Sequence, residues 1–204
     1  MDAGRFFRIA MSMEPTGSAL IDFAEAAYDL QPDDEQWLAQ LIAAGAPALD
    51  RGLGVFGFTC FRTPQPGRLD IHQLHAEAGL EELADRVHRL ESEIPPELIW
   101  TLSRPTMPMT LSEAAGENVE ALNVILAHFD FAKDGLGMST FDPNGHGVYL
   151  IAPLPKVTSL SERSRERYQM LAAHFGAGSR LRRALAEVVS QPATELPLGA
   201  EVVI

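Results

Sequence analysis

Cysteine is almost absent from this 204-residue chain, which contains only Cys60. A single thiol cannot form a disulfide within the chain, and this composition suits a reducing compartment. Cys60 lies in the apolar run GVFGFTCF, which predicts a small, buried, hydrophobic side chain. The sequence also lacks an apolar stretch long enough to span a bilayer, and residues 1–13 lack the continuous apolar segment of a secretion signal. We therefore expect a cytoplasmic protein that has no membrane partner.

Basic residues are scarce as well. The chain has 16 Lys and Arg against 28 Asp and Glu, and its formal net charge is -12. Binding to a phosphate backbone depends on Lys and Arg displacing counterions, so we expect no DNA binding by this chain alone. The distribution is uneven, because residues 163–185 contain six Arg and one Glu. That segment carries +5, and the remainder of the chain carries -17.

Signatures of catalysis and of cofactor binding are missing. There is no nucleophile elbow, no metalloprotease helix and no phosphate-binding loop. His72 and His75 are three residues apart, but a zinc site needs three or four ligands. Gly52, Gly54 and Gly57 match G-x-G-x-x-G, yet this motif follows a predicted helix and enters a predicted strand, the reverse of a dinucleotide site. We interpret Gly52 as a helix end and the other two as strand glycines, and expect no enzyme, cofactor or metal.

Helical and β-hairpin patterns alternate along the chain. Apolar spacing predicts helices near 18–29, 33–50, 80–94, 118–129 and 160–188. Strands are predicted near 53–62, 68–75, 136–142 and 147–153, joined in pairs by the turns TPQPG and DPNGHG. Residues 97–109 are predicted to form a short strand that enters a proline-broken loop. This order indicates an α+β fold, an antiparallel sheet with helices packed on it, and not a series of βαβ units.

The final helix combines arginines with small side chains. We expect the helix to cover the body of the domain with its large apolar residues, Leu171, Phe175, Leu181 and Leu185. We expect its small residues to allow another element to approach closely; these are Ala172, Ala173, Gly176, Ala177 and Gly178. In a symmetric dimer, Arg180, Arg182 and Arg183 would face acids such as Asp33, Asp34 or Glu35 of a second copy, with Gly176 closely packed and apolar contacts supplying most of the association. The alternative is an ordinary surface helix.

Three stretches together resemble a known family. They are residues 26–58, with Trp37-Leu38 and LDRGLGV; residues 141–185, with FDPNGHG and AAHFGAGSRLRR; and the closing GAEVVI. They are similar to the N-terminal sensory regions of LuxR-type helix-turn-helix transcriptional regulators of myxobacteria and relatives, over most of residues 20–204. The resemblance implies a GAF- or PAS-like fold. It also implies a sensor domain at 14–188 and a linker at 189–204 that begins a missing DNA-binding output region. Because Met11 and Met13 are both plausible starts, we expect residues 1–13 to be a leader.

On this resemblance we expect the signal-sensing domain of a cytoplasmic LuxR-type regulator, without its helix-turn-helix. Alternatives are a self-contained small-molecule-binding protein, an enzyme of unknown reaction, and a dimerisation module. We expect a small-molecule ligand and a homodimer formed through residues 160–188. The candidate pocket residues are large and apolar, a composition that is equally typical of an ordinary core: Phe56, Phe58, Trp100, Met107, Phe129, Met138 and Tyr149.

Overall fold

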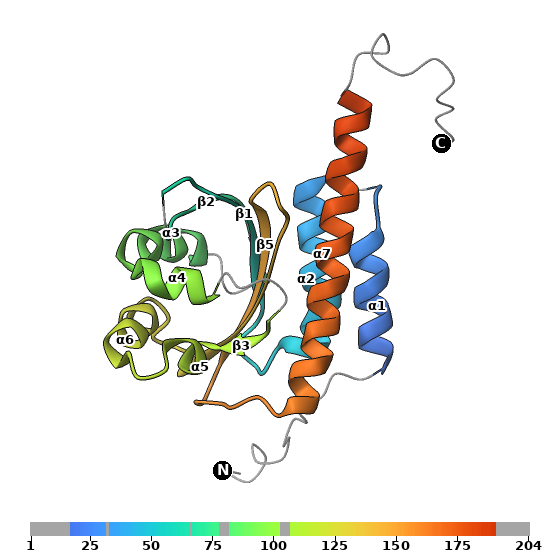
Figure 1. Cartoon of the computed structure of the whole chain (residues 1–204). Coiled ribbons are helices and arrows are strands. Elements are labelled where there is room, and N and C mark those ends of the chain that lie inside the picture. Colours follow the sequence, from blue (N-terminus) through green and yellow to red (C-terminus); the bar gives the residue numbers. More distant parts are fainter. Residues whose placement is uncertain (1–16, 32, 66, 78–81, 103–106, 191–204) are drawn as a thin grey trace.

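The protein is described by a computed structural model that covers residues 17–190, apart from residues 32, 66, 78–81 and 103–106. The predicted leader at 1–13, and the predicted linker beyond residue 190, lie outside the described residues. An antiparallel sheet separates two layers of helices (Figure 1). One layer contains α1 (Gly17–Tyr28), α2 (Asp34–Leu49) and α7 (Glu162–Ser190); the other contains α3 (Leu83–Glu93), α4 (Pro96–Leu102), α5 (Leu111–Ala115) and α6 (Val119–His128). The predicted α+β class, with its long C-terminal helix, is confirmed.

The sheet contains β1 (Phe56–Arg62), β2 (Leu69–Ala76), β3 (Met109–Thr110), β4 (Asp134–Phe141) and β5 (His146–Leu154). Its strand order is β2-β1-β5-β4-β3, and every neighbouring pair is antiparallel. Both predicted hairpins are present, and pairing of β1 with β5 joins them into one sheet. In the β4–β5 turn, the Asp142 carboxylate accepts hydrogen bonds from the backbone N–H groups of Asn144 and His146, at 2.8 and 3.1 Å. This is the local side-chain bonding that favours Asp in turns.

The backbone of the glycine motif at residues 52–57 binds the carboxylate of Asp50. Asp50 Oδ1 accepts hydrogen bonds from the backbone N–H groups of residues 52–54, at 2.7, 3.0 and 2.8 Å. Gly52 and Gly54 adopt left-handed conformations, with φ of 92° and 78°. Because α2 ends at Leu49 and β1 begins at Phe56, Gly52 does not end the helix and the prediction that Gly54 lies in a strand is wrong. Gly57 does lie in β1, as predicted, and no helix begins there.

Residues 96–102 form helix α4, so the prediction of a strand there is wrong. The carbonyl of Pro95 accepts hydrogen bonds from the N–H groups of Leu98 and Ile99, at 3.0 and 3.2 Å. Pro96 has no N–H group and a fixed φ, and both properties suit the first position of a helix. The proline pair therefore ends α3 and also begins α4.

Two apolar cores lie on opposite faces of the sheet, because successive strand residues point to opposite sides. The first core, beneath α1, α2 and α7, includes Trp37, Leu41, Met138, Leu150, Tyr168, Leu171 and Phe175. The second, beneath α3 to α6, includes Phe56, Phe58, Val87, Ile99, Ile125, Phe129 and Tyr149. Cys60 is also buried in the second core, as predicted.

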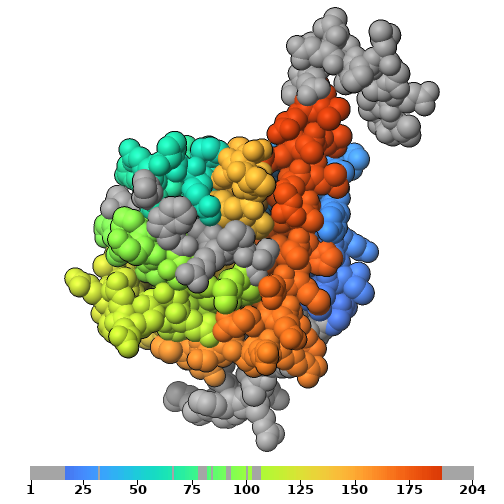
Figure 2. All heavy atoms as spheres, viewed as in Figure 1, coloured from blue at the N-terminus to red at the C-terminus, as the bar shows by residue number. Residues whose placement is uncertain are grey.

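Helix α7 packs along the domain for most of its length, and its last turns extend past it (Figures 1 and 2). Leu171 and Phe175 are fully buried, as predicted, but Leu181 and Leu185 are 46% and 44% exposed, so their predicted role in covering the body is wrong. Gly176 and Gly178 are buried against the same chain, on Thr140 of β4 and on Ala27 of α1. The close approach that small residues allow is therefore used within the domain.

Candidate ligand-binding pocket

An apolar cavity of about 140 Å³ lies between the sheet and the layer formed by α3, α4, α5 and α6. Strands β1, β2, β4 and β5 supply its floor, and the four helices supply its walls. Of the predicted pocket residues, Phe56, Phe58, Phe129 and Tyr149 line this cavity. Sequence reasoning missed the aliphatic walls, which include Val87, Leu90, Ile99, Leu102, Ile125 and Leu126.

Aromatic pairs hold one side of the cavity. The antiparallel register of β1 and β5 places Phe58 opposite Tyr149, and their rings stack with centroids 4.8 Å apart. Phe56 stacks on Phe129, which follows α6, at a centroid distance of 5.9 Å. The cross-strand pair stabilises the sheet, and the stacking of Phe56 on Phe129 joins the sheet to the end of α6. These rings therefore have structural contacts of their own while one part of each faces the cavity.

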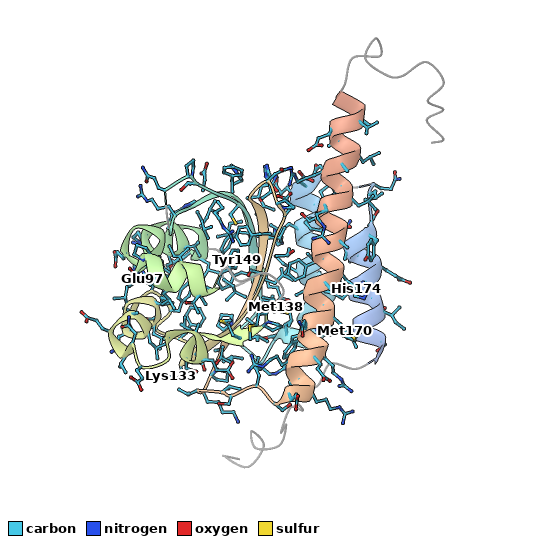
Figure 3. All side chains as sticks on the ribbon, in the orientation of Figure 1. Glu97, Lys133, Met138, Tyr149, Met170 and His174 are labelled. Atoms are coloured by element: carbon cyan, nitrogen blue, oxygen red, sulfur yellow. The ribbon has the colours of Figure 1, made fainter. Side chains whose placement is uncertain are left out.

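The other predicted pocket residues lie elsewhere. Met138 belongs to the core on the opposite face of the sheet, and Figure 3 shows it and Tyr149 on opposite sides. Met107 is 46% exposed and does not line the cavity. The backbone of Trp100 lies in α4, but its side chain falls outside the described part of the structure.

Two glycines of β4 form part of the cavity floor. Gly135 and Gly137 are two residues apart, so they face the same side of the sheet, and both line the cavity. The residues that alternate with them, Leu136 and Met138, belong to the opposite core. A visible signal for these positions was the period of two in KDGLGM, where small residues alternate with large ones.

Asp134 is the charged residue that reaches the cavity among the described lining residues. It is 1% exposed, and its carboxylate accepts four hydrogen bonds. Oδ1 accepts from the N–H groups of Ser112 and Gly135, at 3.0 and 2.9 Å, and Oδ2 accepts from the Ser112 hydroxyl and the Thr158 N–H, at 2.7 and 3.0 Å. These bonds join β4 to α5 and to the segment before α7, so this carboxylate is occupied in holding the fold.

A second carboxylate, Glu113, continues this connection. Its Oε1 accepts hydrogen bonds from the Leu160 N–H at 3.2 Å and from Arg165 Nη2 at 3.0 Å, and its Oε2 accepts from the Thr110 N–H at 3.1 Å. Burial acts to raise the pKa of Glu113, but the two backbone bonds and Arg165 outweigh it and lower that pKa below its usual value. The carboxylate therefore stays ionised and ties α5 to the first turn of α7.

A smaller set of polar residues surrounds a space of about 190 Å³ on the other face of the sheet, between α2 and α7. Its two arginines have partners in the same chain. Arg182 donates to Asp34 Oδ1 at 3.0 Å and to the Asp29 carbonyl at 2.8 Å, and Arg183 pairs with Asp142. The predicted partner acid Asp34 is thus bound within one copy. We interpret this space as part of the attachment of α7 to the domain.

Within residues 17–190, outside the undescribed gaps, no three His, Cys, Asp or Glu side chains are grouped so that they could hold a metal ion. None of the helices in the described part of the chain has the length and apolar character needed to cross a bilayer.

By sequence, the chain matches no protein-family model and no curated protein. By structure, it is similar to the N-acylhomoserine lactone-dependent LuxR family transcription factor CepR2 from Burkholderia cenocepacia, with a TM-score of 0.52, 18% identity, and coverage of 86% of this chain and 97% of that one. It is equally similar to the phycoerythrobilin-bound GAF domain of a cyanobacterial phytochrome, with a TM-score of 0.52, 12% identity, and coverage of 87% and 100%. The chain therefore has a fold of the kind found in LuxR-type ligand-binding domains and GAF domains.

Proposed function

We propose that this chain is the small-molecule-sensing domain of a cytoplasmic LuxR-type transcriptional regulator, and that it binds its signal without catalysing a reaction. The observation that carries the proposal is the apolar cavity between the sheet and α3 to α6, in a fold shared with two ligand-binding domains. Pockets with few polar groups are typical of small-molecule sites. The sequence resemblance to sensory regions of such regulators, those of myxobacteria included, supports the same proposal.

The contacts of β4 and β5 suggest how occupancy of the cavity would reach α7. Gly137 and Tyr149 face the cavity, whereas the alternate residues of the same strands face the core beneath α7. Gly176 of α7 packs on Thr140 of β4, and Arg183 pairs with Asp142 in the β4–β5 turn. A shift of this hairpin would therefore move surfaces on which α7 rests. Coupling of this kind needs a ligand that binds one arrangement better than the other.

The proposal is tested by screening a collection of small molecules for compounds that raise the melting temperature of the purified chain, because a ligand that binds only the folded state stabilises it. Hydrogen exchange is then measured with and without each hit. For a sensor, we expect protection to change in the cavity strands and also in α7 around residues 171–185. A ligand that leaves α7 unchanged would favour a simple binding protein, and the absence of any ligand would contradict the proposal.

The exposed end of α7 is where we place the homodimer contact. Leu181, Leu185 and Val188 are 46%, 44% and 43% exposed, and their spacing of four and three residues is that of a two-helix seam. Gly176 and Arg182, which the sequence assigned to the dimer, make contacts within one copy instead.

We predict that the parent chain sediments as a dimer at high micromolar concentration and that Leu185→Glu sediments as a monomer, because a charge in an apolar seam loses its hydration. Met170→Glu places the same charge at an apolar residue of the same helix that is 50% exposed and lies outside this seam, so it is the matched control and should remain dimeric. Sedimentation velocity of the three proteins measures the effect. A monomeric parent would exclude this contact.

A further inference from the structure

The glycines in the cavity floor are not required by the backbone. Neither Gly135 nor Gly137 has a positive φ. A Cβ atom added at Gly135 would meet nothing closer than the Ala152 carbonyl at 4.0 Å, and one added at Gly137 nothing closer than the Met109 carbonyl at 3.8 Å. Both distances are ordinary contacts. Gly57, in contrast, is held against the Tyr149 carbonyl, where an added Cβ would come within 2.6 Å. The two β4 glycines therefore differ from a glycine that close packing requires, and their effect is to leave space.

Glycine within a strand weakens it, because it contributes no packing and loses more conformational freedom on folding. Two such residues, on the same face and over the same cavity, keep open a volume that larger side chains could fill. This arrangement indicates a cavity kept for an occupant.

The chemistry of the lining restricts that occupant. Among the described side chains around the cavity, the Tyr149 hydroxyl and the Asp134 carboxylate are the oxygen- or nitrogen-bearing groups. Asp134 already accepts four hydrogen bonds from the protein. A buried polar group without a partner is costly. An N-acylhomoserine lactone, the molecule on which CepR2 depends, has one amide N–H and three oxygens, more than one tyrosine hydroxyl can satisfy.

The size of the cavity is a second restriction. Its volume of about 140 Å³ is close to that of an apolar cavity of about 150 Å³ that stays dry and binds benzene. Drug-sized ligands occupy pockets of roughly 300–1,000 Å³. The space therefore suits one ring or a short alkyl chain.

We infer that the part of the ligand that enters this cavity is an uncharged hydrocarbon group, a single ring or a short unbranched chain. This part of the ligand carries no hydrogen-bonding group. This inference rests on the proposed sensing function and specifies the ligand that it would use. The same chemistry could come from a small free hydrocarbon or from the end of an amphiphile whose polar head stays outside.

The test measures the melting temperature of the full chain with matched probes: toluene, n-heptane, heptanoate and N-hexanoyl homoserine lactone. We expect toluene or n-heptane to raise it and the lactone at equal concentration to leave it unchanged. Heptanoate separates the two sources, since it should act only if a polar head can remain outside the cavity. A lactone that binds more tightly than both hydrocarbons would overturn the ligand class while leaving the sensor proposal intact. Failure of every probe would overturn this inference, and the sensor proposal would still be decided by the wider screen.

Cavity-filling variants show whether the hydrocarbon binds at this site. Gly137→Leu places a side chain in the open volume, so we expect it to remove the shift caused by toluene or n-heptane without lowering the melting temperature of the unliganded protein. If that variant does not fold, Gly137→Ala, whose Cβ has room, should reduce affinity at least several-fold. Gly17→Ala is the control, because an added Cβ there meets nothing within 4 Å and the position is remote from the cavity. Unchanged hydrocarbon binding by Gly137→Leu would overturn the inference.

Discussion

Replacing Asp134 with Ala is expected to destabilise the fold by about 3–5 kcal/mol, because three backbone N–H groups and one hydroxyl lose their acceptor together. The side chain is almost fully buried, so water cannot readily replace it. The total stability of a domain is about 5–15 kcal/mol, and the loss is therefore a large part of it. Urea unfolding followed by circular dichroism measures the change.

Two further variants test the cause of this loss. Asp134→Asn keeps one oxygen acceptor but places an amide N–H group toward a donor, so we expect an intermediate loss. Asp130→Ala removes a carboxylate that pairs with Arg86 but is 77% exposed, and such pairs contribute about 0–1 kcal/mol. If Asp134→Ala were no more damaging than Asp130→Ala, the four hydrogen bonds would not be holding α5 and the segment before α7 to the sheet.

The hairpins were predictable from sequence because their determinants are local. Turn residues such as those of DPNGHG fix the chain reversal, and alternation in the flanking segments identifies the strands. Helix α4 was not predictable in this way. A proline pair is compatible with a loop between a helix and a strand, and also with the end of one helix followed by the start of the next. Asp134 was missed for a different reason. Its partners Ser112 and Thr158 are more than 20 residues away on either side, and no local pattern indicates that they meet.

The pocket was predictable only in part. The candidate residues were chosen because they are large and apolar, a criterion that does not separate the two faces of a sheet. Phe56, Phe58 and Tyr149 line the cavity, whereas Met138 lies in the opposite core. Helices cover both faces here, so β4 is apolar on both sides and its pattern cannot say which residues face which layer. The feature that distinguishes the cavity face of β4 is the absence of side chains at Gly135 and Gly137.

Replacing Gly178 with Ala gives opposite expectations from sequence and from structure. Alanine favours a helix over glycine by about 1 kcal/mol, so helix propensity alone predicts a more stable protein. In the structure, α1 and α7 approach so closely that a Cβ at Gly178 would overlap the carbonyl oxygen of Ala27. The same oxygen accepts a hydrogen bond at 3.2 Å from Nε1 of Trp37, which is 2% exposed. A shift of α1 would therefore also leave the buried indole N–H without its acceptor.

We predict that Gly178→Ala lowers the free energy of unfolding by about 3 kcal/mol, the combined effect of overpacking at the helix contact and loss of the Trp37 hydrogen bond, less the gain in propensity. Gly176→Ala is the matched comparison in the same helix. Its added Cβ would meet the side chain of Thr140, which can rotate, whereas the Ala27 backbone cannot, so the loss there should be smaller. Urea unfolding of both variants gives the order of the two losses.

Helix α7 connects the sheet to the exposed seam at Leu181, Leu185 and Val188. A Gly178→Ala protein as stable as its parent would mean that α1 does not hold α7 in this position. The proposed coupling between the cavity and the exposed end of α7 would then lack the contact that fixes the helix.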